Sequence, residues 1–124
     1  MKLVKFLFII VLLASASNSL FSQNKVDPTG TWSFKADAAP YEYNSGDIVI
    51  GKEGKEHTAK IVFGGSYEIK GRDVAMDKDQ LTIKISIEDE AIHIKGTVTG
   101  ETINGKATYS EGTISFIAER KKEE

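Results

Sequence analysis

The segment Leu81-Thr82-Ile83-Lys84-Ile85-Ser86-Ile87-Glu88 alternates apolar and polar residues without interruption. A strict period of two is typical of a half-buried β-strand, because successive side chains point to opposite faces of a sheet. The segments 92–98 and 114–119 repeat the alternation. Antiparallel sheets commonly bury one face and expose the other, so this pattern predicts a small antiparallel β domain with one dry face and one wet face.

Outward from residue 81, turn residues divide the chain into about eight short segments of this kind. They cover 30–35, 48–50, 59–63, 67–76, 81–87, 91–99, 103–109 and 114–120. Short connections favour antiparallel neighbours, and closure removes exposed edges, so we predict an all-β, up-and-down meander closed into a barrel. A two-sheet sandwich with the same strand order is the alternative. The fourth segment changes parity at Gly71-Arg72, which predicts a bulge or bend there.

The predicted inner face is apolar along the whole chain. Its members are Trp32, Phe34, Ile48, Ile50, Ala59, Ile61, Phe63, Leu81, Ile83, Ile85, Ile87, Ile92, Ile94, Val98, Ile103, Ala107, Ile114 and Phe116. General acid–base catalysis needs a positioned titratable group, and this face has none before Arg120, which argues against a hydrolase. His57 and His93 lack metal-ligand spacing, and the acidic turn 88–90 is read as an ordinary polar turn, so we expect no metal and no cofactor.

The first residues predict export. Lys2 and Lys5 precede an uninterrupted apolar run over 6–13 and the small residues Ala14-Ser15-Ala16, which is the order of a cleavable signal peptide. We therefore divide the chain into a signal peptide at 1–22, a linker at 23–29, the barrel at 30–121 and a charged tail at 122–124. The cut is expected between residues 16 and 22, and the mature protein is expected to be periplasmic or secreted.

Charge and composition limit the classes of partner that the domain can bind. Removal of residues 1–22 takes away two lysines and no acidic residue, so the formal charge moves from −2 to −4. An acidic domain without a basic patch has no electrostatic reason to bind nucleic acid. The chain has no cysteine, which excludes disulfides, thiol chemistry and a cysteine-linked lipid anchor. We expect a monomer with no membrane span once the signal peptide is removed.

Four stretches carry a resemblance to a known family: Gly30-Thr31-Trp32-Ser33-Phe34, Ile94-Lys95-Gly96-Thr97-Val98-Thr99-Gly100, Ile103-Asn104-Gly105-Lys106-Ala107 and Ile114-Ser115-Phe116-Ile117-Ala118-Glu119-Arg120-Lys121. The chain resembles a small lipocalin-like β-barrel domain of exported Bacteroidetes-type proteins, which also occurs appended C-terminally to secreted amidohydrolase-like enzymes. The Gly-x-Trp opening and the closing arginine are also similar to lipocalin and avidin barrels. The resemblance spans nearly the whole mature chain. It implies a barrel fold and supplies no catalytic residues.

Two functional hypotheses remain. The first is a non-enzymatic binding or accessory module for a protein partner, with the irregular stretch 38–45 as its contact surface. Tyr41 and Tyr43 would supply contact area there, and replacing both with serine should leave the thermal midpoint nearly unchanged. The alternative for this stretch is a floppy loop with a tyrosine covering a barrel mouth. The alternative is a carrier of a small apolar ligand inside the barrel. The many Ile and Phe residues favour a filled interior, whereas an apolar cavity of about 300 Å³ or more would favour the carrier.

Strand parity also predicts one specific contact. Trp32 points inward at the start of the first strand, and Arg120 points inward at the end of the last strand. In a closed meander with an even number of strands, these two strands are antiparallel neighbours. We therefore expect the Arg120 guanidinium to stack on the Trp32 indole and to close that end of the barrel.

Overall fold

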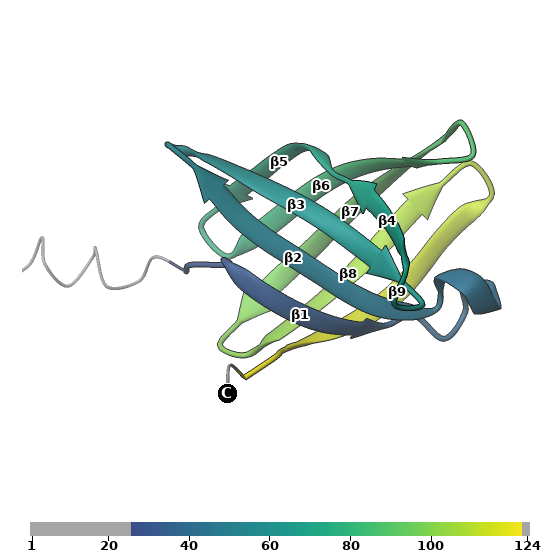
Figure 1. Cartoon of the computed structure of the whole chain (residues 1–124), viewed down its shortest axis with the longest axis horizontal. Coiled ribbons are helices and arrows are strands. Elements are labelled where there is room, and N and C mark those ends of the chain that lie inside the picture. The colour runs from purple at the N-terminus through teal and green to yellow at the C-terminus, as the bar shows by residue number, and fades with distance from the viewer. Residues whose placement is uncertain (1–25, 123–124) are drawn as a thin grey trace, which may run out of the picture.

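The computed structural model describes residues 26–122, which form one antiparallel sheet curled into a nearly closed barrel (Figure 1). The predicted signal peptide lies outside the described residues. The elements are β1 (Gly30–Lys35), the 3-10 helix η1 (Tyr41–Tyr43), β2 (Ser45–Glu53), β3 (Glu56–Phe63), β4 (Tyr67–Lys70), β5 (Arg72–Asp77), β6 (Gln80–Ile87), β7 (Glu90–Thr99), β8 (Thr102–Tyr109) and β9 (Gly112–Arg120).

The strand order is β4-β3-β2-β1-β9-β8-β7-β6-β5, so every strand pairs with its neighbour in the chain except at two places. At one of them β1 pairs with β9, and Trp32 stands directly opposite Arg120. At the other, β4 and β5 end the sheet on its two sides. The predicted antiparallel meander is confirmed, and closure through β1 and β9 is the pairing expected from strand parity.

The strand count differs from the expected eight because the fourth predicted segment is two strands. β4 pairs with β3, and after one residue, Gly71, β5 pairs with β6. The Gly71 amide donates to the Ala59 carbonyl (2.8 Å). A Cβ at Gly71 would lie 2.8 Å from Ile83 Cγ2, so only glycine lets the chain turn this corner against the core. The chain bends here without reversing, which leaves β1 and β9 antiparallel.

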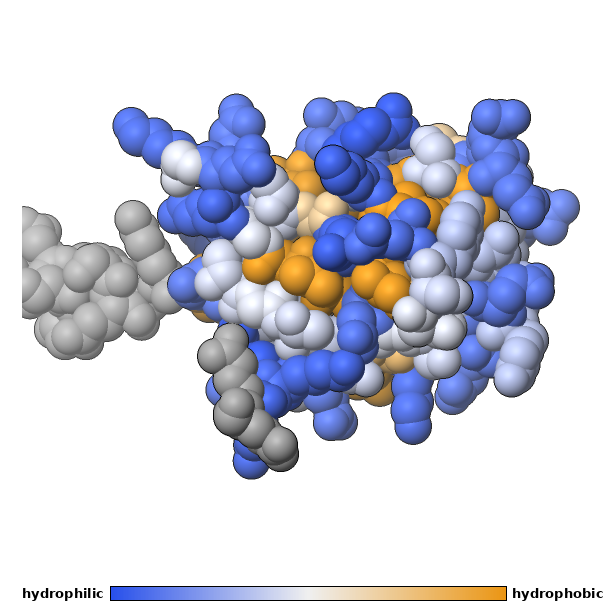
Figure 2. Space-filling model, viewed as in Figure 1, coloured by the Kyte–Doolittle hydropathy of each residue, from blue (hydrophilic) through white to orange (hydrophobic). Residues whose placement is uncertain are grey.

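The predicted inner face is confirmed as the core. Fifteen of its residues are buried, and Ile92, Ala107 and Ile114 are partly buried against them. Polar and charged side chains cover most of the outer face, with an apolar strip showing between them on the side seen in Figure 2. Outward-facing Val49 and Val62, both half-buried, belong to the neighbouring strands β2 and β3. This division into wet and dry faces is the one that the alternation predicts.

The described part of the predicted linker is not a free linker, because it packs on the barrel. Val26 lies against the core, and Pro28 is among the most deeply buried residues. Its carbonyl accepts a hydrogen bond from the Trp32 indole (Nε1 to O, 2.9 Å). Proline is apolar, and here Pro28 covers the end of the barrel beside the tryptophan.

Candidate functional site: an apolar cavity at one end of the barrel

The two ends of the barrel are built differently. Alternate connections of a meander lie at the same end. One end therefore carries the connections 36–44, 64–66, 88–89 and 110–111, at the right of Figure 1. The other end carries the connections 54–55, 78–79 and 100–101, together with residues 26–29 and the end of β9. We call the first the open end and the second the closed end.

The closed end is solid. The largest fully buried side chains of the described residues are those of Trp32, Leu81, Ile83, Ile103, Val98 and Pro28. Five of them lie toward this end of their strands, and Pro28 lies in the segment that precedes β1. Glycine lets the wall come inward here, since a Cβ at Gly96 would lie 2.7 Å from Ile103 Cγ2. The predicted filled interior therefore describes this half correctly.

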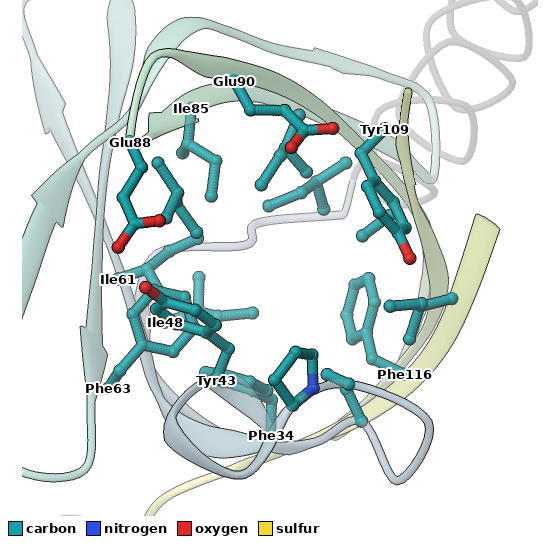
Figure 3. A pocket seen from close by; sticks show the side chains of 18 of the residues that line it. Phe34, Tyr43, Ile48, Ile61, Phe63, Ile85, Glu88, Glu90, Tyr109 and Phe116 are labelled. Atoms are coloured by element: carbon teal, nitrogen blue, oxygen red, sulfur yellow. The ribbon is translucent and has the colours of Figure 1, made fainter. Parts of the chain in front are cut away.

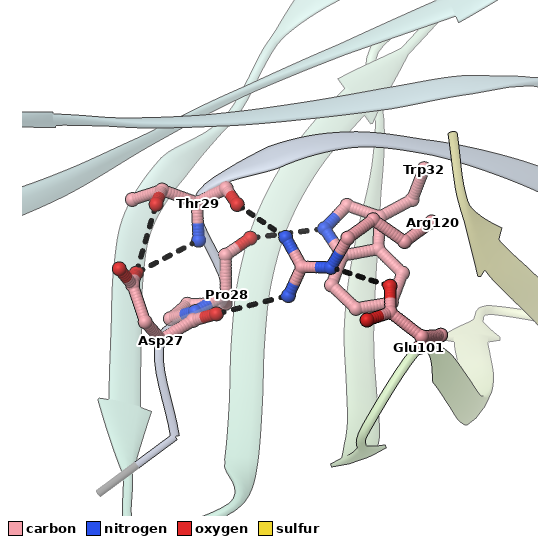
Figure 4. Close-up of polar contacts among 6 residues, drawn as sticks. All are labelled: Asp27, Pro28, Thr29, Trp32, Glu101 and Arg120. Carbon is pink, nitrogen blue, oxygen red and sulfur yellow. Dashed lines mark hydrogen bonds and ion pairs between the residues drawn. The ribbon is translucent and has the colours of Figure 1, made fainter. Parts of the chain in front are cut away.

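The Trp32–Arg120 contact closes this end (Figure 4). The Arg120 guanidinium carbon lies 4.2 Å from the centroid of the Trp32 ring. Its nitrogens also donate to the carbonyls of Thr29 (Nη1 to O, 2.5 Å) and Asp27 (Nη2 to O, 3.1 Å). An ion pair with Glu101 (Nε to Oε2, 3.1 Å) completes the set. Arg120 thus joins β9 to the N-terminal segment and to the β7–β8 turn, in the arrangement expected from parity.

The open end holds a cavity of about 320 Å³, above the 300 Å³ set as the mark of a ligand site (Figure 3). Its walls come from β1, β2, β3, β6, β7, β8 and β9. The lining residues are Phe34, Ala36, Ala39, Pro40, Tyr43, Ile48, Ile61, Phe63, Ile85, Ile87, Glu88, Glu90, Ile92, Ile94, Ala107, Tyr109, Glu111, Ile114 and Phe116. The expectation of a filled interior is wrong for this half.

Small inward residues account for the space. Ala36, Ala39 and Ala107 line the cavity, and Gly105 lies beneath Phe116. The Phe116 ring packs directly on Gly105, because a Cβ at residue 105 would lie only 2.5 Å from Phe116 Cζ. The large Ile and Phe side chains thus cover the wall of this half without filling its middle. Ligand pockets in proteins start at about 300 Å³, so the space suits a small molecule.

Aromatic rings form one side of the mouth. Phe63 meets Phe34 edge-on (centroids 5.7 Å apart) and Tyr43 edge-on (5.2 Å). Tyr43 also contacts Tyr67 (6.4 Å). Partial burial of its hydroxyl, and secondarily the Glu88 carboxylate, raise the pKa of Tyr43, so the phenol stays neutral at ordinary pH.

The predicted contact pair, Tyr41 and Tyr43, therefore divides into two roles. Tyr41 is 90% exposed on η1 and touches none of the aromatic residues above. Tyr43, two residues on, is half-buried and covers the mouth of the cavity. Because the Tyr43 ring packs against the core, we expect its loss to lower stability, whereas the expectation of an unchanged thermal midpoint stays a prediction for Tyr41.

Three carboxylates also line the mouth: Glu88 and Glu90 at the β6–β7 turn, with Glu88 beside Tyr43 (Figure 3), and Glu111 at the β8–β9 turn. Glu90 accepts hydrogen bonds from both the hydroxyl and the amide of Ser110 (amide N to Oε1, 3.0 Å), which ties the two turns together. These bonds, the hydroxyl bond first, hold the pKa of Glu90 below its usual 4.5. Figure 3 shows the Glu88, Glu90 and Tyr109 side chains around the mouth.

Sequence reasoning missed these rim residues and read 88–90 as an ordinary polar turn. The signal that could have found them is the alternation of turns. Once Trp32 and Arg120 mark one end of a meander, the turns at 88–89 and 110–111 must lie at the other. Their acidic residues then meet at one opening, although about twenty positions separate them in the sequence.

Other site types find no support in the described chain. Residues 26–122 contain no group of three or more His, Asp or Glu side chains placed to hold a metal ion. The same residues include no helix long and apolar enough to cross a membrane.

Comparison with known proteins supports the fold alone. No family model and no curated protein matches the chain. Among solved structures, the secretory abundant heat soluble protein 4 of Ramazzottius varieornatus is similar, with a TM-score of 0.54 and 17% sequence identity. The match covers 79% of this chain and 98% of that one. The two proteins thus share a small all-β barrel-like fold.

Proposed function

We propose that this protein is an exported, non-enzymatic carrier that holds a small apolar ligand in the open half of its barrel. The observation that carries the proposal is the cavity of about 320 Å³, walled by Ile, Phe and Ala side chains and open between η1 and the acidic turns. Burying apolar ligand surface contributes about 25 cal/mol per Å², and a preformed cavity needs little ordering. The signal-peptide pattern supports export.

A dye-binding assay tests the carrier function. N-phenyl-1-naphthylamine is uncharged and brightens in apolar surroundings, so the protein should raise its fluorescence in a saturable manner. Ala107→Phe adds a ring to the cavity wall between Ile94 and Ile114. It should raise the dye's Kd about tenfold or more, because the added ring takes space that the dye needs and overpacking costs about 1–3 kcal/mol.

Ala91→Phe is the matched control, because Ala91 is exposed on the outer side of β7, the strand that pairs with β8. It adds the same ring outside the barrel and should leave the Kd unchanged. Dye that fails to bind the wild type, or that binds Ala107→Phe as tightly as Ala91→Phe, would refute the carrier. Mass spectrometry of the exported protein should find that the first 16 to 22 residues are missing, and an intact Met1 on the exported form would refute this cleavage.

A second candidate, an accessory module for a protein partner, is favoured by Tyr41. A tyrosine 90% exposed on a connection over a rigid barrel is the type of residue enriched at interfaces, and Tyr67 is exposed beside the same mouth. Tyr41→Ser alone is the clean test, because it leaves Tyr43 packed. It should reduce recovery of a partner by pull-down and leave the thermal midpoint unchanged; undiminished recovery would eliminate this role.

A further inference from the structure

The mouth of the cavity carries one sign of charge. Glu88, Glu90 and Glu111 line it, and within residues 26–122 the lining includes no Lys, Arg or His. The four ion pairs found in that range use other carboxylates, so none of the three rim glutamates is paired with a basic side chain of the described residues. Any ligand whose tail fills the apolar cavity must place its head group beside them.

The rim is also held in place. Ser110 donates to Glu90 through its hydroxyl and its amide, and so fixes that carboxylate between the two turns. Glu88 and Asp89 both have positive φ angles, 51° and 68°, which makes the two-residue connection between β6 and β7 a tight turn. The negative charge is thus a built feature of the mouth and is independent of any ligand.

Two tyrosines at the mouth also favour a cation there. Tyr43 and Tyr109 line the mouth among the carboxylates. The face of a phenol ring attracts a cation, and its hydroxyl can hydrogen-bond a neutral or charged head group.

Resting on the proposed function, we propose that the cavity selects amphiphiles with a cationic head group, such as a primary amine, and rejects those with a carboxylate. The apolar wall binds the tail of either kind equally. The head groups differ, because the three negative charges at the mouth attract an ammonium ion and repel a carboxylate. An uncharged alcohol should fall between the two.

Displacement of N-phenyl-1-naphthylamine by three eight-carbon amphiphiles tests the selection. Octylamine, 1-octanol and octanoate share a tail and differ in the head group. In low-salt buffer at pH 7, octylamine should displace the dye at about a tenfold or more lower concentration than octanoate, with 1-octanol between them. The gap should shrink strongly near 1 M salt, where the screening length is about 3 Å.

Glu88→Gln/Glu111→Gln removes two rim charges and leaves the Glu90–Ser110 contact intact. It should largely erase the preference for octylamine while 1-octanol displaces the dye as before. The matched control is Glu53→Gln/Glu56→Gln, which removes two exposed charges beside the β2–β3 turn at the closed end. The control carries the same change in net charge and should keep the wild-type preference.

Equal displacement by octylamine and octanoate, or the same loss of preference in both double variants, would overturn the head-group proposal. The carrier would then still stand on dye binding and on the Ala107→Phe result. If the dye fails to bind the wild type at all, the carrier fails and the selection fails with it. The two proposals are therefore distinguished by separate measurements on one set of proteins.

Discussion

Arg120→Ala should destabilise the barrel more than an ordinary surface substitution. Arg120 is at the last position of β9, where exposed arginines usually matter little. Here its side chain lies over the Trp32 indole at 4.2 Å, donates to two backbone carbonyls and pairs with Glu101. The substitution removes all of these contacts together and frees the N-terminal segment from β9.

The expected loss of unfolding free energy follows from the individual contacts of Arg120. A guanidinium over an indole contributes about 0.5–2 kcal/mol, and a hydrogen bond from a charged donor about 1.5–3 kcal/mol. The carbonyls of Thr29 and Asp27 can be rehydrated, and the pair with the exposed Glu101 adds about 0–1 kcal/mol, so the upper limits do not add. We expect a loss of about 2–4 kcal/mol. For a domain of this size, 1 kcal/mol moves the thermal midpoint by about 4–8 °C.

Urea unfolding monitored by fluorescence measures this loss directly, because Trp32 is the only tryptophan of the chain. Trp32→Ala removes this reporter and is therefore followed by circular dichroism; it should cost more, about 3–5 kcal/mol, since its side chain is fully buried. The two losses should fall short of additivity by about 0.5–2 kcal/mol in the double variant followed by circular dichroism. Arg120→Lys should restore only part of the stability, because an ammonium lacks the planar fork.

If the free energy of unfolding of Arg120→Ala lies within about 0.5 kcal/mol of wild type, the usual range of surface substitutions, the Arg120 contacts do not stabilise the barrel. Exact additivity of the two losses would show that the stacking contact contributes nothing. The Glu101→Ala variant is the internal control, since it removes only the exposed ion pair and should cost less than about 1 kcal/mol.

Three further outcomes are expected. Gly71→Ala should lower the free energy of unfolding by about 1–3 kcal/mol, because its Cβ would press on Ile83; unchanged urea unfolding would contradict the close approach at this corner. Ser110→Ala should destabilise at pH 7, where Glu90 is ionised. The difference in unfolding free energy from wild type should shrink as the pH falls below about 4.5 and through the lowered folded-state pKa of Glu90. A difference that grows in acid would show that Ser110 does not stabilise the ionised Glu90. Tyr43→Ser should lower the thermal midpoint while Tyr43→Phe holds it, and equal midpoints would show that the ring does not pack as described.

Much of the wall of the barrel was predictable from single strands. Alternation from Leu81 to Ile87 specifies which side chains face inward, because parity is a local property of an extended chain. The same rule extended to Trp32 and Arg120 predicted a contact between residues 88 positions apart. The parity switch at Gly71 predicted the bend. It did not predict that β4 and β5 pair with different strands, since pairing depends on strands that lie far away in the sequence.

Only the tertiary structure decided where the barrel is solid and where it is hollow. Ile83 and Ile85 are two positions apart on one strand and look alike in the sequence, yet Ile83 is in the filled half and Ile85 lines the cavity. Empty space depends on how far apart the opposite walls stand. That distance is set by glycines that let strands approach, by the Pro28 segment that closes one end, and by the alanines that line the other. The sequence determined which residues point inward, and the distance between opposite walls determined whether those residues fill the barrel or leave a cavity.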